Sequence, residues 1–183
     1  MELRTVGDKL YWSYANLAMA HCAVTQGADQ YQKTHYMVRK KLFVGLQNGT
    51  MNIGALADDE RLKMILPQAC CYCGSRDELT ADHLIPRKVG GLHLGENLVW
   101  ACRSCNSSKG ARDALAWLAS RRAFPPLLLL RRHLKLAIGH CREFDLLNLP
   151  ADGAADLPFD LEAVPLRFPR PAELCLWVTP LDG

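Results

Sequence analysis

Residues 70–91 read CCYCGSRDELTADHLIPRKVGG, in which a Cys-x-x-Cys pair is followed by an Asp-His pair and then by two glycines. A cysteine pair of this spacing provides half of the four ligands that a tetrahedral zinc site requires. The other half lies further along the chain, in the stretch CRSC that begins at residue 102, with 28 residues between the two pairs. Together the pairs predict a structural Zn²⁺ ion bound by Cys70, Cys73, Cys102 and Cys105.

The other cysteines have no partner of this spacing. Cys71 competes for the metal because it can pair with Cys73, but the matched two-residue spacing favours Cys70 and leaves Cys71 as a neighbouring free thiol. An alternative is that the four cysteines are buried and reduced without a metal, although two matched pairs rarely arise by accident. We interpret the remaining cysteines as core or surface thiols: Cys22, Cys141 and Cys175.

Length and composition indicate one domain. The chain has 183 residues, 49% of them hydrophobic, which is enough to bury a core. No apolar run reaches membrane-spanning length and no secretory signal opens the sequence, so we expect a cytoplasmic protein with no membrane partner. Residues 1–144 carry 20 basic and 12 acidic residues, whereas residues 145–183 carry 2 and 7. The basic part is compatible with a polyanionic partner, and equally with a solvated surface of no functional meaning.

Apolar residues spaced three and four apart predict amphipathic helices on both sides of the cysteine-rich segment. We expect helices at residues 7–24, 29–47, 58–64, 106–122 and 126–141. Aromatic residues of the first two helices are expected in a core rather than on a base-stacking surface. The chain then divides into an N-terminal helical region (1–66), a central module (67–122), a C-terminal helix (123–149) and an acidic, proline-rich arm (150–183). The arm either packs on the domain, as its two apolar clusters favour, or forms a mobile tail.

The segment from Cys70 to Asp113, about a quarter of the chain, resembles an HNH endonuclease of the ββα-metal type with zinc-binding cysteine pairs. The resemblance rests on the order of its motifs: the two cysteine pairs, Asp-His-x-x-Pro, Gly-Gly, Asn-Leu and Cys-Asn-x-x-Lys. It implies an α+β fold in which mainly helical flanks surround a small module of two strands and a helix. The structural zinc would clamp the open side of that module and supply much of its folding energy.

The resemblance places the three motif residues of the family at His83, Asn97 and Asn106, the last of which is often histidine in the family. Hydrolysis of a phosphodiester needs an activated water and a cation beside the phosphate. His83 is suited to act as the base near neutral pH, while Asp82 and Asn106 offer oxygen ligands to Mg²⁺, Mn²⁺ or another divalent cation. Asn97 is expected to brace the loop between the strands and to orient His83.

Asp82 and His83 are neighbours, and neighbours on a regular strand face opposite sides. We therefore predict that the pair lies at a strand end or a bulge, and that Gly90-Gly91 lets the chain turn into a second strand at about residues 98–101. Three basic residues are candidates for phosphate contacts or are plain exposed charges: Lys109, Arg87 and Lys88. The other histidines are expected at the surface or hydrogen-bonded in the core: His21, His35, His93, His133 and His140.

The expected function is that of a metal-dependent endonuclease acting on DNA, in restriction, anti-phage defence or a mobile element. RNA stays open as a substrate. Two alternatives are a zinc-stabilised DNA-binding module without catalysis and a nuclease subunit that is active only with a protein partner. One active site per chain predicts nicking by a monomer, or cleavage of both strands by a homodimer.

Overall fold

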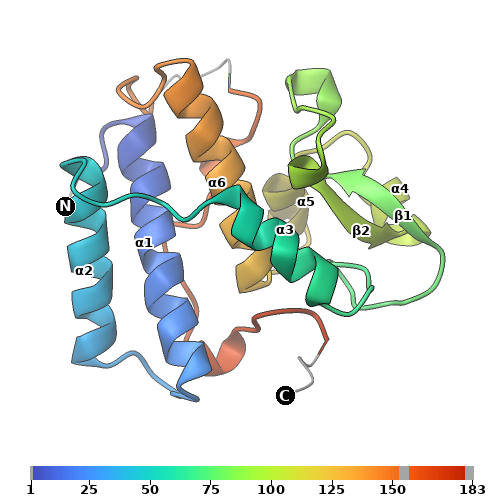
Figure 1. The fold of residues 1–183 in the computed structure, drawn as a ribbon, viewed down its shortest axis with the longest axis horizontal. Helices are drawn as coiled ribbons and strands as arrows, with labels where there is room; N and C mark the ends of the chain where they lie inside the picture. Colours follow the sequence, from blue (N-terminus) through green and yellow to red (C-terminus); the bar gives the residue numbers. More distant parts are fainter. Residues whose placement is uncertain (1, 153–156, 180–183) are drawn as a thin grey trace.

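The computed structural model describes residues 2–152 and 157–179 and has an α+β fold dominated by helices, as predicted (Figure 1). No helix within these ranges is long and apolar enough to cross a membrane. Two strands form the sheet. The helices are α1 (Val6–Thr25), α2 (Lys33–Gln47), α3 (Leu56–Ile65), α4 (Arg103–Lys109), α5 (Ala114–Ser120) and α6 (Leu127–Glu143), and the strands are β1 (Leu79–His83) and β2 (Leu98–Cys102).

Helix α1 lies between α2 and α6 and forms the centre of the helical part (Figure 1). Its first turn is fixed by a reciprocal cap, in which Thr5 Oγ1 accepts from the Asp8 amide (3.0 Å) and the Asp8 carboxylate accepts from the Thr5 amide (3.2 Å). Its Leu10 and Leu17 are buried in the main core. The two predicted N-terminal helices are confirmed, with α2 beginning at Lys33, four residues later than expected.

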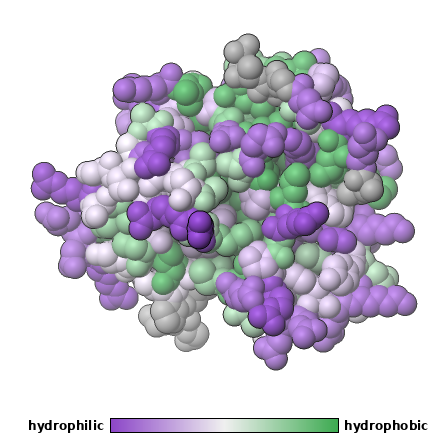
Figure 2. Space-filling view, turned by 180° about the vertical axis from the view of Figure 1, so that it is seen from behind, coloured by the Kyte–Doolittle hydropathy of each residue, from purple (hydrophilic) through white to green (hydrophobic). Residues whose placement is uncertain are grey.

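Aromatic residues of α1 and α2 contribute to this core, as predicted. Trp12 meets Phe43 edge to face, with ring centroids 5.2 Å apart, and Tyr14 is buried. Tyr36 is the exception, because 43% of its surface is exposed. Seen from behind, the surface of the molecule carries long hydrophilic side chains around its edge, with hydrophobic surface showing between them (Figure 2).

Helix α6 connects the helical part to the small sheet. Arg131 and Lys135 both pair with the buried Asp59 of α3, the first through its Nε at 2.8 Å. Arg132 pairs with Glu60 of α3 at 2.8 Å, and its Nη1 also donates to the Leu98 carbonyl at 3.2 Å. Helix α6 is therefore bonded both to α3 and to β2, and the Arg132 guanidinium reaches both, which fixes the place of the sheet.

Strands β1 and β2 pair antiparallel, with Asp82 opposite Val99 and His83 opposite Leu98. His83 is the last residue of β1, so the predicted position of the Asp-His pair at a strand end is confirmed. The predicted second strand is also confirmed and extends to Cys102. Helix α4 follows β2 directly and contacts both strands. The hairpin and α4 together form the expected ββα unit.

The predicted single helix at residues 106–122 is wrong, because two short helices take its place. Helix α4 begins earlier, at Arg103, and ends at Gly110, which has a φ of 57° that residues with a side chain rarely adopt. Helix α5 begins after Asp113, whose Oδ1 accepts from the amides of Leu115 (2.9 Å) and Ala116 (3.1 Å). The expected helix is therefore interrupted between a glycine that ends α4 and an aspartate that caps α5.

The buried Asp113 also holds α5 to α6, since its Oδ2 lies 2.7 Å from His133 Nε2. Burial acts to raise the pKa of Asp113. The pKa is nevertheless lowered, because His133 and the two helix amides favour the ionised carboxylate. His133 is thus one of the core histidines that the sequence predicts.

The described part of the acidic arm packs on the helices. Trp12 Nε1 donates to the Leu166 carbonyl (3.1 Å) and Ser13 Oγ donates to the Pro165 carbonyl (2.8 Å). Leu161 is buried in the core that α1 and α6 share. Of the two possibilities for the arm, the structure supports packing for residues 157–179, while residues 153–156 and 180–183 lie outside the described residues.

Candidate active site

The four predicted zinc ligands gather at one end of the hairpin. The sulfur atoms of Cys70, Cys73, Cys102 and Cys105 all lie within 4.8 Å of one another. The Cys73 and Cys102 sulfurs are 3.7 Å apart, which agrees with the separation of about 3.8 Å that a tetrahedron with Zn–S bonds of about 2.3 Å requires. The residues therefore fit a Zn²⁺ ion bound by four thiolates.

The local chemistry also suits a metal. Burial raises the pKa of the Cys73 and Cys105 thiols, whereas a hydrogen bond from the Cys105 amide lowers the pKa of Cys102. Four adjacent thiols do not ionise together without a cation, and a bound Zn²⁺ deprotonates the thiols that coordinate it. Cys71 is fully buried and stands outside the sulfur cluster, as predicted.

A surface hollow at the other end of the hairpin brings together the predicted catalytic residues. Asp82 and His83 from β1 and Asn106 from α4 line this hollow. Three basic residues line it as well: Arg87, Lys88 and Lys109. Arg87 and Lys88 belong to a short turn after β1 and are exposed, whereas Lys109 is buried. Residues as far apart in the sequence as Asp82 and Lys109 thus meet at a single site.

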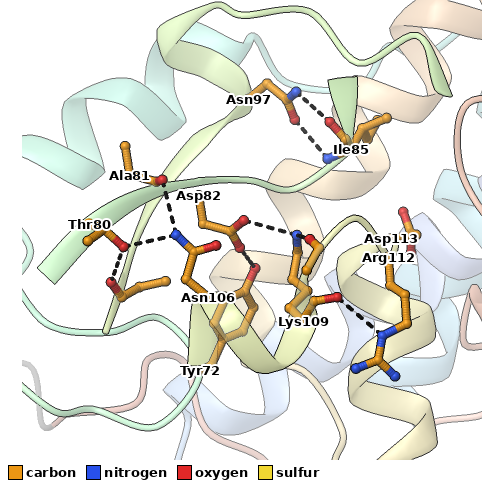
Figure 3. A network of polar contacts seen from close by, with 12 residues as sticks. Tyr72, Thr80, Ala81, Asp82, Ile85, Asn97, Asn106, Lys109, Arg112 and Asp113 are labelled. Carbon is orange, nitrogen blue, oxygen red and sulfur yellow. Dashed lines mark hydrogen bonds and ion pairs between the residues drawn. The ribbon is translucent and has the colours of Figure 1, made fainter. Parts of the chain in front are cut away.

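Asn106 is held so that its amide oxygen is free. Its Nδ2 donates to Thr80 Oγ1 (2.9 Å) and to the Ala81 carbonyl (3.4 Å), as Figure 3 shows. Among the residues that the structure describes, no donor reaches Oδ1. Because hard divalent cations prefer oxygen ligands, Asn106 presents the atom that such a cation would bind.

Asp82 is 4% exposed, and both of its carboxylate oxygens are hydrogen-bonded (Figure 3). Lys109 Nζ donates to Oδ1 at 3.0 Å, and Tyr72 Oη donates to Oδ2 at 2.7 Å. Lys109 is itself 2% exposed, so its ammonium is directed at Asp82 rather than at the solvent. A carboxylate has about four acceptor positions. Asp82 therefore keeps the capacity to coordinate a cation beside these two donors, and with Asn106 it fits the expected divalent ion.

Asn97 lies outside the hollow, buried in the loop between the strands. Its Nδ2 donates to the carbonyls of Ile85 (2.8 Å) and Leu92 (2.9 Å), while its Oδ1 accepts from the Ile85 amide (2.9 Å). These three bonds tie the chain after β1 to the chain before β2. This is the geometry expected of a residue that braces the loop.

His83 is paired with a second histidine that the sequence analysis did not assign to the site. His83 Nε2 lies 2.9 Å from His93 Nδ1. Partial burial and the neighbouring His93 lower the pKa of His83. Its imidazole is therefore neutral near pH 7, the form in which a histidine acts as a base.

Tyr72 and His93 are the two site residues that sequence reasoning missed. Tyr72 lies between the two cysteines of the first Cys-x-x-Cys pair. This position could have indicated Tyr72 as a site residue, because a residue between two predicted zinc ligands is held in place. For His93 the sequence contains no comparable signal. Its position depends on how the loop of ten residues after His83 folds back.

Replacing Tyr72 by phenylalanine is expected to lower the free energy of unfolding by about 1.5–3 kcal/mol, because the lost hydrogen bond has a charged acceptor. Tyr31→Phe is a matched control, since Tyr31 Oη donates to the neutral carbonyl of Pro169 at 2.8 Å and its loss should cost about 1 kcal/mol. Urea unfolding of the two variants measures the difference. Equal losses would contradict a charged Asp82 carboxylate bonded to Tyr72.

The fold and site define a ββα module with a cluster of four cysteines at one end and a carboxylate, an imidazole and an amide around one hollow. Residues 70–112 match the family model of the HNH endonuclease, which confirms the resemblance for this segment. No curated protein and no solved structure matches the chain.

Proposed function

We propose that this protein is a metal-dependent endonuclease that hydrolyses phosphodiester bonds in DNA. The observation that carries the proposal is the meeting of Asp82, His83 and Asn106 in one hollow. Phosphodiester hydrolysis needs a base and oxygen ligands for a cation, and these three side chains can supply both. The match of residues 70–112 to the HNH endonuclease model supports the same reaction.

In the proposed reaction, neutral His83 takes a proton from the water that attacks the phosphorus atom. Asp82 and Asn106 would hold a divalent cation, Mg²⁺ or Mn²⁺, which when bound stabilises the negative charge that develops on the phosphate. The exposed Arg87 and Lys88 line the same hollow and would contact phosphates of the bound strand. Lys109 lies 3.0 Å from the buried Asp82 carboxylate and holds it in place.

DNA is the proposed substrate because the part of the chain that surrounds the site is basic, with 20 basic and 12 acidic residues in positions 1–144. RNA is the alternative substrate. We place the activity in restriction, anti-phage defence or a mobile element, since these processes use endonucleases of this kind. A monomer would nick DNA, and a homodimer would cut both strands.

Incubation of the protein with supercoiled plasmid tests the proposal. With Mg²⁺ or Mn²⁺ we expect conversion to open-circular or linear DNA, and none with EDTA. His83→Ala should lower the rate by about 100-fold to 10,000-fold, the range expected for loss of a general base. His21→Ala, on α1 and remote from the hollow, is the control and should cleave normally. A structured RNA in parallel reactions decides between the two substrates.

One observation favours a second candidate, a zinc-stabilised DNA-binding module that is inactive alone. Both oxygens of Asp82 already accept hydrogen bonds, from Lys109 and Tyr72, so cation binding must compete with an internal ammonium group. If the protein bound DNA but did not cleave the plasmid with any metal, the result would support this candidate or a nuclease subunit that needs a protein partner. Rescue of cleavage by an added partner would distinguish the last two.

A further inference from the structure

We propose that His93 is a positioning residue, which fixes the tautomer of His83 so that Nδ1 of His83 is the atom that accepts the proton from water. The inference rests on the proposed function, because it assigns a base role to His83. Its structural basis is the contact between His83 Nε2 and His93 Nδ1 at 2.9 Å, with ring centroids 5.1 Å apart. His83 lines the hollow, whereas His93 is not among the lining residues.

A neutral imidazole carries one N–H group and one lone pair. If His93 donated to His83 Nε2, the lone pair of His83 would be occupied and its Nδ1 would carry hydrogen, leaving no atom to act as base. If His83 donates from Nε2, its Nδ1 keeps the lone pair. In the described part of the chain His93 makes the sole hydrogen bond to the His83 ring, so the direction of this bond separates the two states, and the proposed role of His83 requires that its Nε2 is the donor.

The loop that carries His93 has a defined conformation. Asn97 bonds to the carbonyl of Leu92, the residue just before His93. A Cβ atom at Gly91 would lie 2.0 Å from the Ile85 carbonyl oxygen, so the close approach of the two segments requires glycine. Gly90 has a φ of 104°, in the region that favours glycine. These features bring position 93 back to the end of β1.

His93 itself contributes little to the core, because its side chain is exposed. Its contact with His83 is therefore not explained by burial. The exposure also makes substitutions informative, since surface changes usually alter stability by less than about 0.5 kcal/mol. As an acceptor, His93 would act as the carbonyl or carboxylate partners of histidines do elsewhere, by fixing which nitrogen of His83 carries the proton.

Two variants of similar size test the proposal. In His93→Asn the amide oxygen takes approximately the place of Nδ1 and still accepts a hydrogen bond, whereas His93→Leu has nearly the same shape and accepts none. We expect His93→Leu to lower kcat for plasmid cleavage by about 10-fold or more with KM unchanged, and His93→Asn to stay within about threefold of the original protein. His21→Leu is the control for loss of a histidine elsewhere.

A second readout does not depend on activity. Nitrogen chemical shifts of the His83 ring, assigned with His83→Ala, should show hydrogen on Nε2 in the original protein and in His93→Asn, and a mixture of tautomers in His93→Leu. Hydrogen on Nδ1 in the original protein would overturn the proposal, as would equal rates for the Asn and Leu variants. If the protein cleaves no nucleic acid, the proposed function fails while the shifts still decide the role of His93.

Discussion

Removal of the zinc ion is expected to unfold the hairpin and α4 and to abolish cleavage, while α1 and α6 stay helical. The hydrophobic cluster at the cysteine end has three buried residues, Cys70, Ala101 and Cys102, which is too small to hold this end of the hairpin without a metal. Zinc binding contributes about 10–16 kcal/mol in zinc-finger peptides, which is comparable with the whole stability of an ordinary domain, about 5–15 kcal/mol. Cys102→Ser should have the same effect as a strong chelator.

Hydrogen exchange measures this prediction most directly. Amides of β1 and β2 should lose protection in the chelated protein and in Cys102→Ser, and those of α1 should keep it. Cys175→Ser is the matched control, because that cysteine is exposed and stands outside the sulfur cluster. Retained protection of β1 in metal-free protein would show that four reduced thiols suffice to hold the unit.

Lys109→Met is expected to lower the free energy of unfolding by about 3–5 kcal/mol in the absence of divalent cations. The side chains of Lys109 and Asp82 are 1% and 5% exposed, and removing one partner of such a pair leaves the other charge buried and uncompensated. A divalent cation at Asp82 would replace the missing positive charge. Mg²⁺ or Mn²⁺ should therefore stabilise the variant more than the original protein.

Thermal unfolding with and without Mn²⁺ tests this second prediction. Lys88→Met is the matched control, since Lys88 lines the same hollow but is exposed, and its loss should change stability by less than about 0.5 kcal/mol. The double variant Asp82→Asn with Lys109→Met removes both charges and should be more stable than Lys109→Met alone. If Mn²⁺ did not raise the unfolding temperature of Lys109→Met, this result would argue against Asp82 as a cation ligand.

The parts of the site that could be predicted from sequence are those fixed by short spacing. Two cysteines separated by two residues can reach one metal whatever the rest of the chain does, so the cluster of four cysteines could be predicted from residues 70–105. The alternation of side chains along a strand placed Asp82 and His83 at a strand end. The loop length and its glycines likewise indicated the hairpin.

The contacts among Tyr72, Lys109 and His93 could not be predicted, because they depend on how separate segments approach one another. Lys109 was expected either to contact phosphate or to be a plain exposed charge, but the close approach of α4 to β1 buries it. The break at Gly110 was missed for a related reason. Apolar residues on both sides of it keep a helical period, and the conformation of one glycine decides where the helix ends.

The packing of the C-terminal arm against α1 has a consequence for synthesis of the protein. Trp12 bonds to a carbonyl 154 residues further along the chain, and Leu161 fills the core beside α1. At about 5–20 residues per second, a ribosome needs roughly ten seconds or more to make the intervening segment. During that interval part of the apolar face of α1 stays exposed to solvent. A chain interrupted before residue 159 would leave that face exposed to chaperones and proteases, because the segment that covers it would not yet have been made.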